Sequence, residues 1–304
     1  MPRLSKLMQR YTPSVTDEAE LYQILEEHTT EKEKIKQDET AYYNKEKDQE
    51  AVQSYYCDID FTQLNEENFM SALHQLLKDT HKHPNSYNPS KYLYPRVDLR
   101  PDGRLISVYS GKIRQPEEVI KEDYQTSLSR KDAIEKADDF STESDTQLVK
   151  IMDKLKYNCE HTVPQSWFNE DEPMRGDLHH LFTCEPVCNS MRSNYPYHDF
   201  FGYQPESANI EQIREACGKA EDHLFEPEHG KGTVARGVLY FLIRYPDQLV
   251  DHHKDEIDTQ LLLKWHEQFP PELYEKHRNQ VIFEMQGNRN PFIDFPEKLK
   301  NIQF

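Results

Sequence analysis

Apolar residues recur at helical spacing in the middle and in the last third of the chain. In residues 65–82, NEENFMSALHQLLKDTHK, apolar positions three and four residues apart fall on one face of a helix. They are Phe69, Leu73, Leu76 and Leu77. The later segments 232–245, 258–269 and 272–285 also have helical character, and prolines or a glycine follow them, which is typical of helix ends. We therefore predict four helices.

Residues 16–53 differ from this pattern because they are dominated by Glu, Lys and Gln and contain neither Pro nor Gly. Thr16 is a suitable N-cap, and Glu18 and Glu20 follow in the first turn. The composition predicts exposed helices. We expect residues 1–60 to form an acidic, mostly helical extension and residues 61–304 to form one packed domain.

Strand-forming residues surround a turn in residues 91–111, KYLYPRVDLRPDGRLISVYSG. The turn is Pro101-Asp102-Gly103, and the flanking β-branched and aromatic residues predict a hairpin. Residues 115–144 are polar without a clear period, so a long surface loop with some helix is expected there. The predicted fold class is α+β, with a small hairpin-containing centre surrounded by helices.

Composition adds constraints on location and partners. The formal net charge is -18, which disfavours nonspecific adhesion to nucleic acid or membrane, so a polyanionic substrate needs a local basic surface or a bound cation. The longest apolar run, residues 238–243, ends at Arg244 and is too short to span a bilayer. The start, MPRLSKLMQRY, lacks the apolar region of a secretory signal, so a cytoplasmic location is expected. Five cysteines are too few for a disulfide scaffold and fit a reducing compartment.

The densest group of chemically capable side chains lies between residues 158 and 194. It consists of Glu160, His161, Asp177, His179, His180, Glu185, Asn189, Arg192 and Asn194. Phosphodiester hydrolysis needs a base that activates water and positive charge that stabilises the transition state. His161 suits the first task, because an ordinary imidazole is largely neutral at pH 7. Glu160 and Asn189 offer the oxygen ligands that Mg²⁺ prefers.

The geometry of this group raises a difficulty. Neighbouring side chains of a strand point to opposite faces, so Glu160 and His161 share one site only if the backbone bends or they reach it from two sides. Residues 185–196, EPVCNSMRSNYP, predict a short helix that ends before Pro196. Asn189 and Arg192 are three residues apart and therefore lie on one face of that helix.

Two further patterns have competing interpretations. Cys159, Cys184 and Cys188, with His179 or His180, have a spacing that a structural zinc site allows. Residues 230–245 carry three basic residues and no acidic one, so they form either a surface that faces phosphate or a plain solvated helix face. The three are Lys231, Arg236 and Arg244.

Several motifs in one order resemble the endonuclease I family. They are NCEHTVPQSWF, RGDLHHLF, VCNSMRSNYPY, KGTVARGVLYFLIRY and QGNRNPFIDFPE, preceded by the segment YPRVDLRPDGRLISVYSG. Together they cover roughly residues 65–297. The resemblance implies a ββα-metal (His-Me finger) nuclease core and a nonspecific endonuclease that cleaves DNA, and RNA as an alternative substrate. Family members are often secreted or periplasmic, which makes secretion the alternative to a cytoplasmic location.

The resemblance also implies roles for individual residues. His161 corresponds to the general base, and Glu160 and Asn189 correspond to the ligands of one divalent ion, Mg²⁺ with Mn²⁺ or Ca²⁺ as substitutes. Cleavage would release the 3′-oxygen and leave 5′-phosphate ends. His179 is expected to orient the site through a hydrogen bond, without contact to substrate.

The sequence departs from better-known members of the family near residue 175. Arg175 stands where they have a glutamate, and the acidic stretch NEDEP replaces a basic segment. The arginine that grips the product phosphate therefore has three candidates, Arg175, Arg192 and Arg289. No membrane or protein partner is inferred. The alternative function is a zinc-stabilised or catalytically inactive protein of the same fold that binds nucleic acid or protein.

Overall fold

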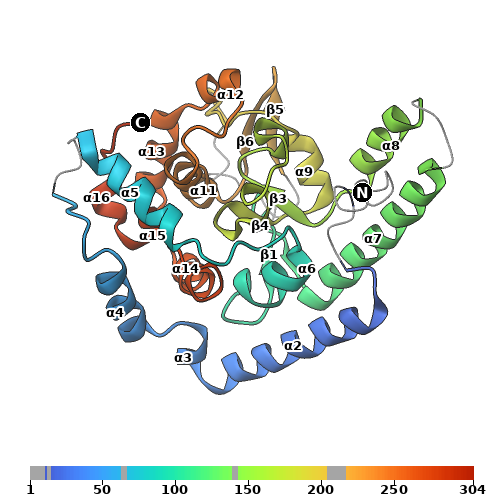
Figure 1. Ribbon diagram of the computed structural model, residues 1–304, viewed down its shortest axis with the longest axis horizontal. Helices are drawn as coiled ribbons and strands as arrows, with labels where there is room; N and C mark the ends of the chain where they lie inside the picture. The colour runs from blue at the N-terminus through green and yellow to red at the C-terminus, as the bar shows by residue number, and fades with distance from the viewer. Residues whose placement is uncertain (1–10, 12–14, 63–66, 139–142, 204–216) are drawn as a thin grey trace.

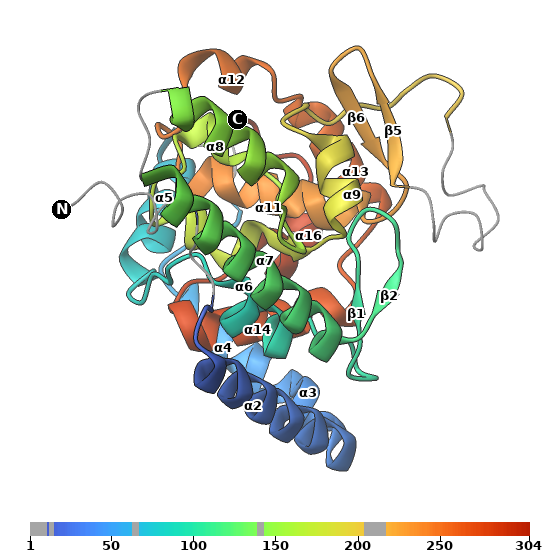
Figure 2. The same cartoon turned by 90° about the vertical axis from the view of Figure 1, so that its right-hand side faces the viewer.

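The computed structural model describes residues 11, 15–62, 67–138, 143–203 and 217–304. Helices dominate, and the strands form three separate two-stranded antiparallel sheets (Figures 1 and 2). The helices are α2 (Glu18–Gln37), α3 (Glu39–Tyr42), α4 (Lys45–Tyr55), α5 (Glu67–Thr80), α6 (Pro89–Tyr92), α7 (Pro116–Asp138), α8 (Glu143–Lys154), α9 (Pro186–Arg192), α11 (Lys231–Arg244), α12 (Asp251–Asp255), α13 (Thr259–Gln268), α14 (Leu273–Gln286), α15 (Pro291–Asp294) and α16 (Pro296–Leu299). The strands are β1 (Leu105–Ile106), β2 (Ile113–Arg114), β3 (Cys159–His161), β4 (Leu181–Thr183), β5 (Gly218–Glu221) and β6 (Leu224–Pro227). This mixture agrees with the predicted α+β class.

Helix α11 lies near the centre of the molecule, and α5, α13 and α15 pack against it (Figure 1). Its apolar side chains join those of α5 and α13 in the larger hydrophobic cluster, where Leu73 and Leu77 are fully buried. The four helices predicted from apolar spacing are all present, as α5, α11, α13 and α14. Burial of the predicted apolar face therefore explains where α5 packs.

The N-terminal helices pack against this body. Leu21 and Ile24 of α2 belong to a second hydrophobic cluster with Val97 and Leu99. At the end of α3, the ring of Tyr42 stacks on His277 at 4.0 Å between centroids, and its hydroxyl donates to the Leu99 carbonyl. Residues 18–55 thus form helices, as predicted, and they bury apolar side chains against the segment that follows α6.

Two predictions about the central region are wrong. Residues 91–97 are helical, in α6 and a π-helical turn at Leu93–Val97, because Leu93, Tyr94 and Val97 are buried together at helical spacing. The turn at 101–103 exists, with Gly103 at φ 73, but it precedes β1, and the hairpin closes through residues 107–112 instead.

The second of these errors concerns residues 115–144, most of which form the long helix α7 and not a loop. Three of the residues that α7 buries are polar, namely Asp123, Ser127 and Arg130. Asp123 accepts hydrogen bonds from the Tyr94 hydroxyl and the Asn158 backbone. A pattern of apolar residues cannot detect such a helix, since buried polar groups need partners that only the fold supplies.

A disulfide joins Cys188 of α9 to Cys217 at the start of β5, and Cys57, Cys159 and Cys184 are free. The expectation of unpaired cysteines is therefore wrong for this pair. The bond ties α9 to the β5–β6 hairpin beside it (Figure 2). Within the described residues, no helix is both long and apolar enough for a membrane span.

Candidate active site

Strands β3 and β4 and helix α9 together carry the predicted site. The strands pair antiparallel, with Glu160 opposite Phe182 and His161 opposite Leu181. Helix α9 begins at Pro186, a residue well suited to the first helical turn, and it carries Asn189. The Asn189 amide donates a hydrogen bond of 2.7 Å to the Cys159 carbonyl, which fixes α9 against β3.

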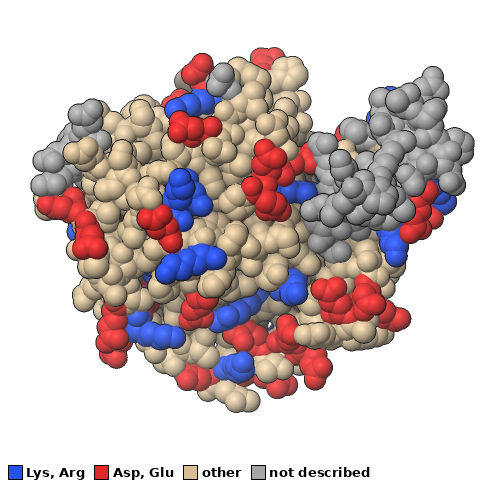
Figure 3. All heavy atoms as spheres, in the orientation of Figure 1, with Lys and Arg blue, Asp and Glu red and all other residues tan. Residues whose placement is uncertain are grey.

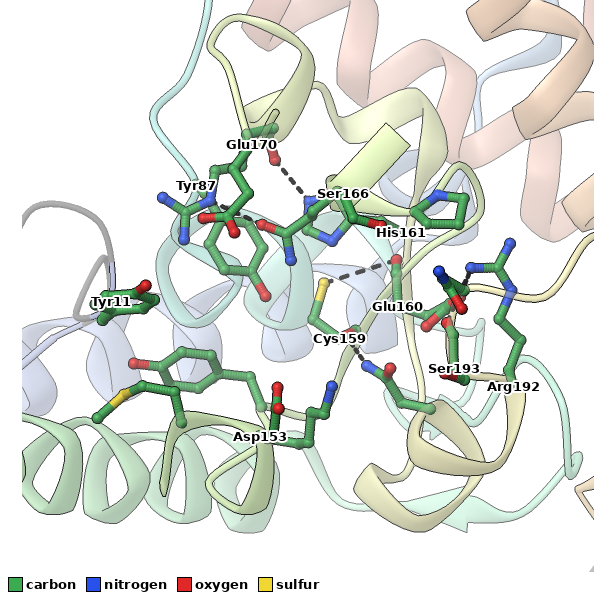
Figure 4. A pocket seen from close by; sticks show the side chains of 18 of the residues that line it. Tyr11, Tyr87, Asp153, Cys159, Glu160, His161, Ser166, Glu170, Arg192 and Ser193 are labelled. Atoms are coloured by element: carbon green, nitrogen blue, oxygen red, sulfur yellow. Dashed lines mark hydrogen bonds and ion pairs between the residues drawn. The ribbon is translucent and has the colours of Figure 1, made fainter. Parts of the chain in front are cut away.

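Glu160 and His161 are neighbours in β3 and point to opposite faces, but the open edge of β3 lets both line one site. In the described part of the chain β3 pairs only with β4, so its other edge is not covered by a strand. The Cys159 carbonyl points to this open edge, where Asn189 meets it. Along this edge no strand of the described chain separates the two faces of β3. Glu160 and His161 consequently line the same cavity (Figure 4).

This cavity has a volume of about 410 Å³ and is lined mainly by polar and aromatic residues. It extends from β3 and α9 to the α7–α8 pair, and Tyr11 lies on its far side (Figure 4). Its lining residues include Tyr87, Lys156, Tyr157, Glu160, His161, Gln165, Arg175, Asn189 and Arg192. The predicted base, both predicted metal ligands and two of the three predicted arginines therefore come together.

The imidazole of His161 is held in one tautomer. Its Nε2 lies 2.9 Å from the backbone carbonyl of Arg175, which can only accept, so Nε2 carries the proton. Nδ1 is then the unprotonated nitrogen, and no described residue forms a hydrogen bond with it. The ring packs against Tyr87 at 4.9 Å and His180 at 5.3 Å between centroids. Burial, helped by nearby His180, holds the pKa of His161 well below its usual range.

Glu160 is a buried carboxyl group with one oxygen in use. Oε1 accepts a hydrogen bond of 2.9 Å from the Tyr109 hydroxyl and lies 3.4 Å from Nη1 of Arg192. Oε2 has no hydrogen-bond partner within the described residues, although only 2% of the residue is exposed. Burial raises the pKa of Glu160 to about 7, and the charge of Arg192 opposes this rise.

The side chains present fit a hard divalent cation. Glu160 directs an unused oxygen at the cavity, and Asn189, whose Nδ2 is bound to the Cys159 carbonyl, has its Oδ1 available. Two protein oxygens suit Mg²⁺, which keeps several waters and takes the rest of its ligands from a substrate phosphate. A buried carboxylate with a raised pKa is also the kind of group that a bound cation stabilises.

The predicted arginines have different surroundings. Arg192 is 1% exposed, donates to the Thr162 carbonyl and pairs with Glu160, so its charge is directed at the carboxylate. Arg175 lies on the cavity wall, where Nε donates to Gln165 and the guanidinium lies over the ring of Tyr87. Arg289 does not line the cavity: it is fully buried and pairs with Asp48 and Asp294.

His179 and the neighbouring Asp177 lie behind the site. Nε2 of His179 lies 3.2 Å from the Asn288 carbonyl, and the ring contacts Tyr240. Asp177 caps the turn before His179 and accepts hydrogen bonds from Tyr240, Tyr245 and Gln286. Neither side chain lines the cavity, so both support β4 from the side of α11.

The zinc alternative is contradicted by the structure. Cys188 forms the disulfide with Cys217, and the Nε2 atoms of His179 and His180 lie within hydrogen-bonding distance of backbone carbonyls. In the described ranges, none of the proposed zinc ligands belongs to a group of three or more His, Cys, Asp or Glu side chains close enough to share an ion.

The basic residues of α11 do not form the phosphate-facing surface that was one interpretation of residues 230–245. Lys231 pairs with Glu226 and Asp199, and Arg236 pairs with Glu275. Both are buried, and Arg244 is 9% exposed. On the face seen in Figure 3, outside the grey atoms, acidic and basic side chains are interspersed without a continuous basic surface.

A sequence profile of the endonuclease I family matches residues 65–297. This range includes β3, β4, α9 and the later helices, and it covers well over half of the chain. The chain belongs to the endonuclease I family. The resemblance inferred from the ordered motifs is thereby confirmed.

Proteins similar to this chain include ribonucleases and a deoxyribonuclease. An extracellular ribonuclease of Bacillus amyloliquefaciens is 32% identical over 135 residues, 40% of this chain and 44% of that protein. A periplasmic deoxyribonuclease of Aeromonas hydrophila is 29% identical over 127 residues, 41% of this chain and 50% of that protein. An extracellular ribonuclease of Bacillus subtilis (strain 168) is 31% identical over 161 residues, 46% of this chain and 52% of that protein. The chain thus spans about half the length of these curated relatives.

One residue of this family member's cavity was missed by sequence reasoning. Lys156 lines the cavity four residues before Glu160, and no described residue forms a hydrogen bond or ion pair with its ammonium group. The arginines of the same wall all have hydrogen-bond or ion-pair partners, whereas Lys156 has neither in the described chain, although its charge helps to lower the pKa of Glu160. The sequence signal was the basic residue directly before YNCEH.

Proposed function

We propose that this chain is a nonspecific endonuclease that hydrolyses phosphodiester bonds of DNA, and of RNA, with one divalent metal ion and His161 as the general base. The observation that carries the proposal is the unprotonated Nδ1 of His161 in the same cavity as the unused oxygen of Glu160. The relatives support nucleic acid as the substrate, since they are named deoxyribonucleases and ribonucleases.

Each residue has a defined part in this mechanism. The Arg175 carbonyl holds the ring of His161 so that Nδ1 accepts a proton from a water molecule in the cavity. The activated water attacks phosphorus, the 3′-oxygen leaves, and a 5′-phosphate end remains. Glu160 and Asn189 would hold Mg²⁺, with Mn²⁺ or Ca²⁺ as substitutes, and when bound the cation supplies positive charge for the transition state and the leaving oxygen.

Positive charge on the protein is placed on both sides of this centre. Arg192 compensates the carboxylate of Glu160, so the buried site is not a bare anion that would repel phosphate. Arg175 and Lys156 stand on the cavity wall, where a phosphate oxygen can bind. We expect Arg175 to contact the cleaved phosphate, and Lys156 to contact a neighbouring one. In an otherwise acidic protein, these local charges favour the approach of nucleic acid.

An inactive binding protein of the same fold is the alternative function. A binding function alone does not explain why His161 has an unprotonated nitrogen in a polar cavity beside two unused ligand oxygens.

To test the proposal, supercoiled plasmid and a structured RNA are incubated with the full chain in Mg²⁺ and in EDTA. Nicking in Mg²⁺ alone, with ends that a ligase seals without a kinase, is expected. Intact plasmid and RNA with every divalent ion tested would refute the proposed endonuclease activity.

The disulfide and the relatives together bear on location. Disulfides persist mainly in oxidising compartments, and the relatives are named as extracellular or periplasmic proteins. Both observations support the proposal that the chain works in such a compartment, which was the alternative to the cytoplasm. Thiol alkylation before reduction should leave Cys188 and Cys217 unlabelled in protein taken directly from its source; labelled thiols would favour the cytoplasm.

Replacement of Lys156 by glutamine should weaken substrate binding without removing the base or the metal ligands. The loss of one phosphate contact lowers the dependence of log K on log salt by roughly 0.7 to 0.9 units. Binding of a fluorescent oligonucleotide is measured in EDTA at several salt concentrations. Lys154→Gln is the matched control, because Lys154 is exposed at the end of α8 and does not line the cavity. An unchanged salt slope for Lys156→Gln would exclude the contact.

A further inference from the structure

Three side chains with metal-binding atoms meet on the outer surface near α12, away from the cavity. They are His252, His253 and Glu256, and one ligand atom from each lies within 4.8 Å of the others. Within the described ranges, no other group of three or more His, Cys, Asp or Glu side chains is this close. None of the three lines the active-site cavity, so the proposed nuclease chemistry does not explain the group.

The local geometry follows from a short helix. His252 lies in α12 and Glu256 caps its C-terminal end four residues later, and His253 lies beside them. Nδ1 of His253 is 2.9 Å from a carboxylate oxygen of Glu256, and the two imidazole centroids are 3.9 Å apart. Ligand atoms around one zinc ion lie up to about 4 Å apart, so small rotations of exposed side chains suffice to close the set.

His253 is held in position by the hydrophobic core, unlike an ordinary surface histidine. Its ring stacks on Trp167 at 4.8 Å with an interplanar angle of 11°, and Trp167 is 2% exposed. The Trp167 carbonyl also accepts a hydrogen bond from the backbone of Val250, immediately before α12. One ligand is therefore oriented in advance, which lowers the entropy lost when an ion binds.

We propose that His252, His253 and Glu256 form a second metal site, which binds Zn²⁺ or a similar borderline divalent ion. Two imidazoles and one carboxylate suit zinc, whereas Mg²⁺ requires oxygen ligands. With three protein ligands, water fills the remaining position. An ion here fixes the ring of His253, which stacks on Trp167 in the turn at Gln165–Phe168, and Gln165 and Ser166 of that turn line the cavity. The expected role is stabilisation of this wall.

The experiment measures Zn²⁺ binding to the full chain by titration calorimetry, in a buffer with excess Mg²⁺. Wild type and Glu160→Gln should both bind one Zn²⁺ at this site, since Glu160 belongs to the other centre. His252→Ala and Glu256→Gln should weaken binding by more than the roughly 10–100-fold that loss of an outer partner of a metal ligand costs. Lys254→Ala is the control on the same helix. His253 itself is left intact, because its loss would also disturb Trp167.

Thermal unfolding and fluorescence provide readouts that do not depend on activity. Zn²⁺ should raise the melting temperature of wild type and of Glu160→Gln. It should leave the melting temperatures of His252→Ala and Glu256→Gln unchanged. Cu²⁺, which takes the same ligands, should quench Trp167 emission in wild type and not in His252→Ala. Unchanged Zn²⁺ affinity in folded His252→Ala and Glu256→Gln would show that the three side chains form only an ion pair and a ring stack. Failure of plasmid cleavage would leave this inference intact, because Zn²⁺ binding by His252, His253 and Glu256 does not require a working nuclease site.

Discussion

Replacement of His161 by alanine is expected to lower plasmid cleavage by about 10²- to 10⁴-fold, the range that a general base contributes. His161 lines the cavity, and the hydrogen bond from its Nε2 to the Arg175 carbonyl leaves Nδ1 as the unprotonated nitrogen. Without it, water in the cavity has no positioned acceptor for its proton. The measurement is the initial rate of nicking of supercoiled DNA at saturating Mg²⁺.

The controls separate catalysis from folding. His161 packs against Tyr87 and His180, so its removal leaves a small gap, and His161→Gln is compared because it fills more of that space. His83→Ala is the matched control, since His83 is exposed and its side chain is outside the cavity. Both His161 variants should bind oligonucleotide in EDTA about as well as wild type. Cleavage by His161→Ala at the wild-type rate would mean that another group is the base.

Glu160→Gln is expected to reduce cleavage by more than about 100-fold and to raise the Mg²⁺ concentration needed for half-maximal rate. Glutamine keeps the shape of the side chain and the contact with Tyr109, but it removes the negative charge that a cation needs. The change also leaves the buried guanidinium of Arg192 without its carboxylate. A moderate loss of thermal stability should therefore accompany the loss of activity.

Glu185→Gln is the matched control for this substitution. Glu185 lies at the start of α9 and pairs with Lys112 and Ser110, outside the cavity. It should retain wild-type activity and Mg²⁺ dependence. If Glu160→Gln loses activity but shows an unchanged Mg²⁺ requirement, Glu160 acts only through Arg192, and the assignment of Glu160 as a metal ligand fails.

Much of the helical framework could be predicted from the sequence, because it depends on local patterns. The apolar faces of α5 and α13 and the prolines that follow α11 and α13 are visible in a single sequence, and burial of those faces determined the packing. Helix α7 was missed because polar residues such as Asp123 occupy its buried side. The first predicted strand failed because Leu93 and Val97 pack at helical spacing in the second cluster.

Some features of the candidate site could be predicted from the sequence, and others only from the structure. Glu160, His161 and Asn189 were predicted from chemical type and family resemblance, and these alone suggested one metal-dependent centre. The sequence could not show that the open edge of β3 lets neighbouring side chains share a cavity. It also could not show that the Arg175 carbonyl determines which nitrogen of His161 is free.

The sequence by itself determined the family and the main helices, and it proposed Glu160, His161 and Asn189 as the reacting groups, since each of these depends on residue type and spacing along the chain. Only the tertiary structure decided the partners of the charged residues. Arg289 pairs with Asp48, far away in sequence, while Lys156 lines the cavity without a hydrogen bond or ion pair in the described chain. His253 stacks on Trp167. The physical reason is that charge pairing and burial depend on which distant segments meet, and local sequence does not contain that information.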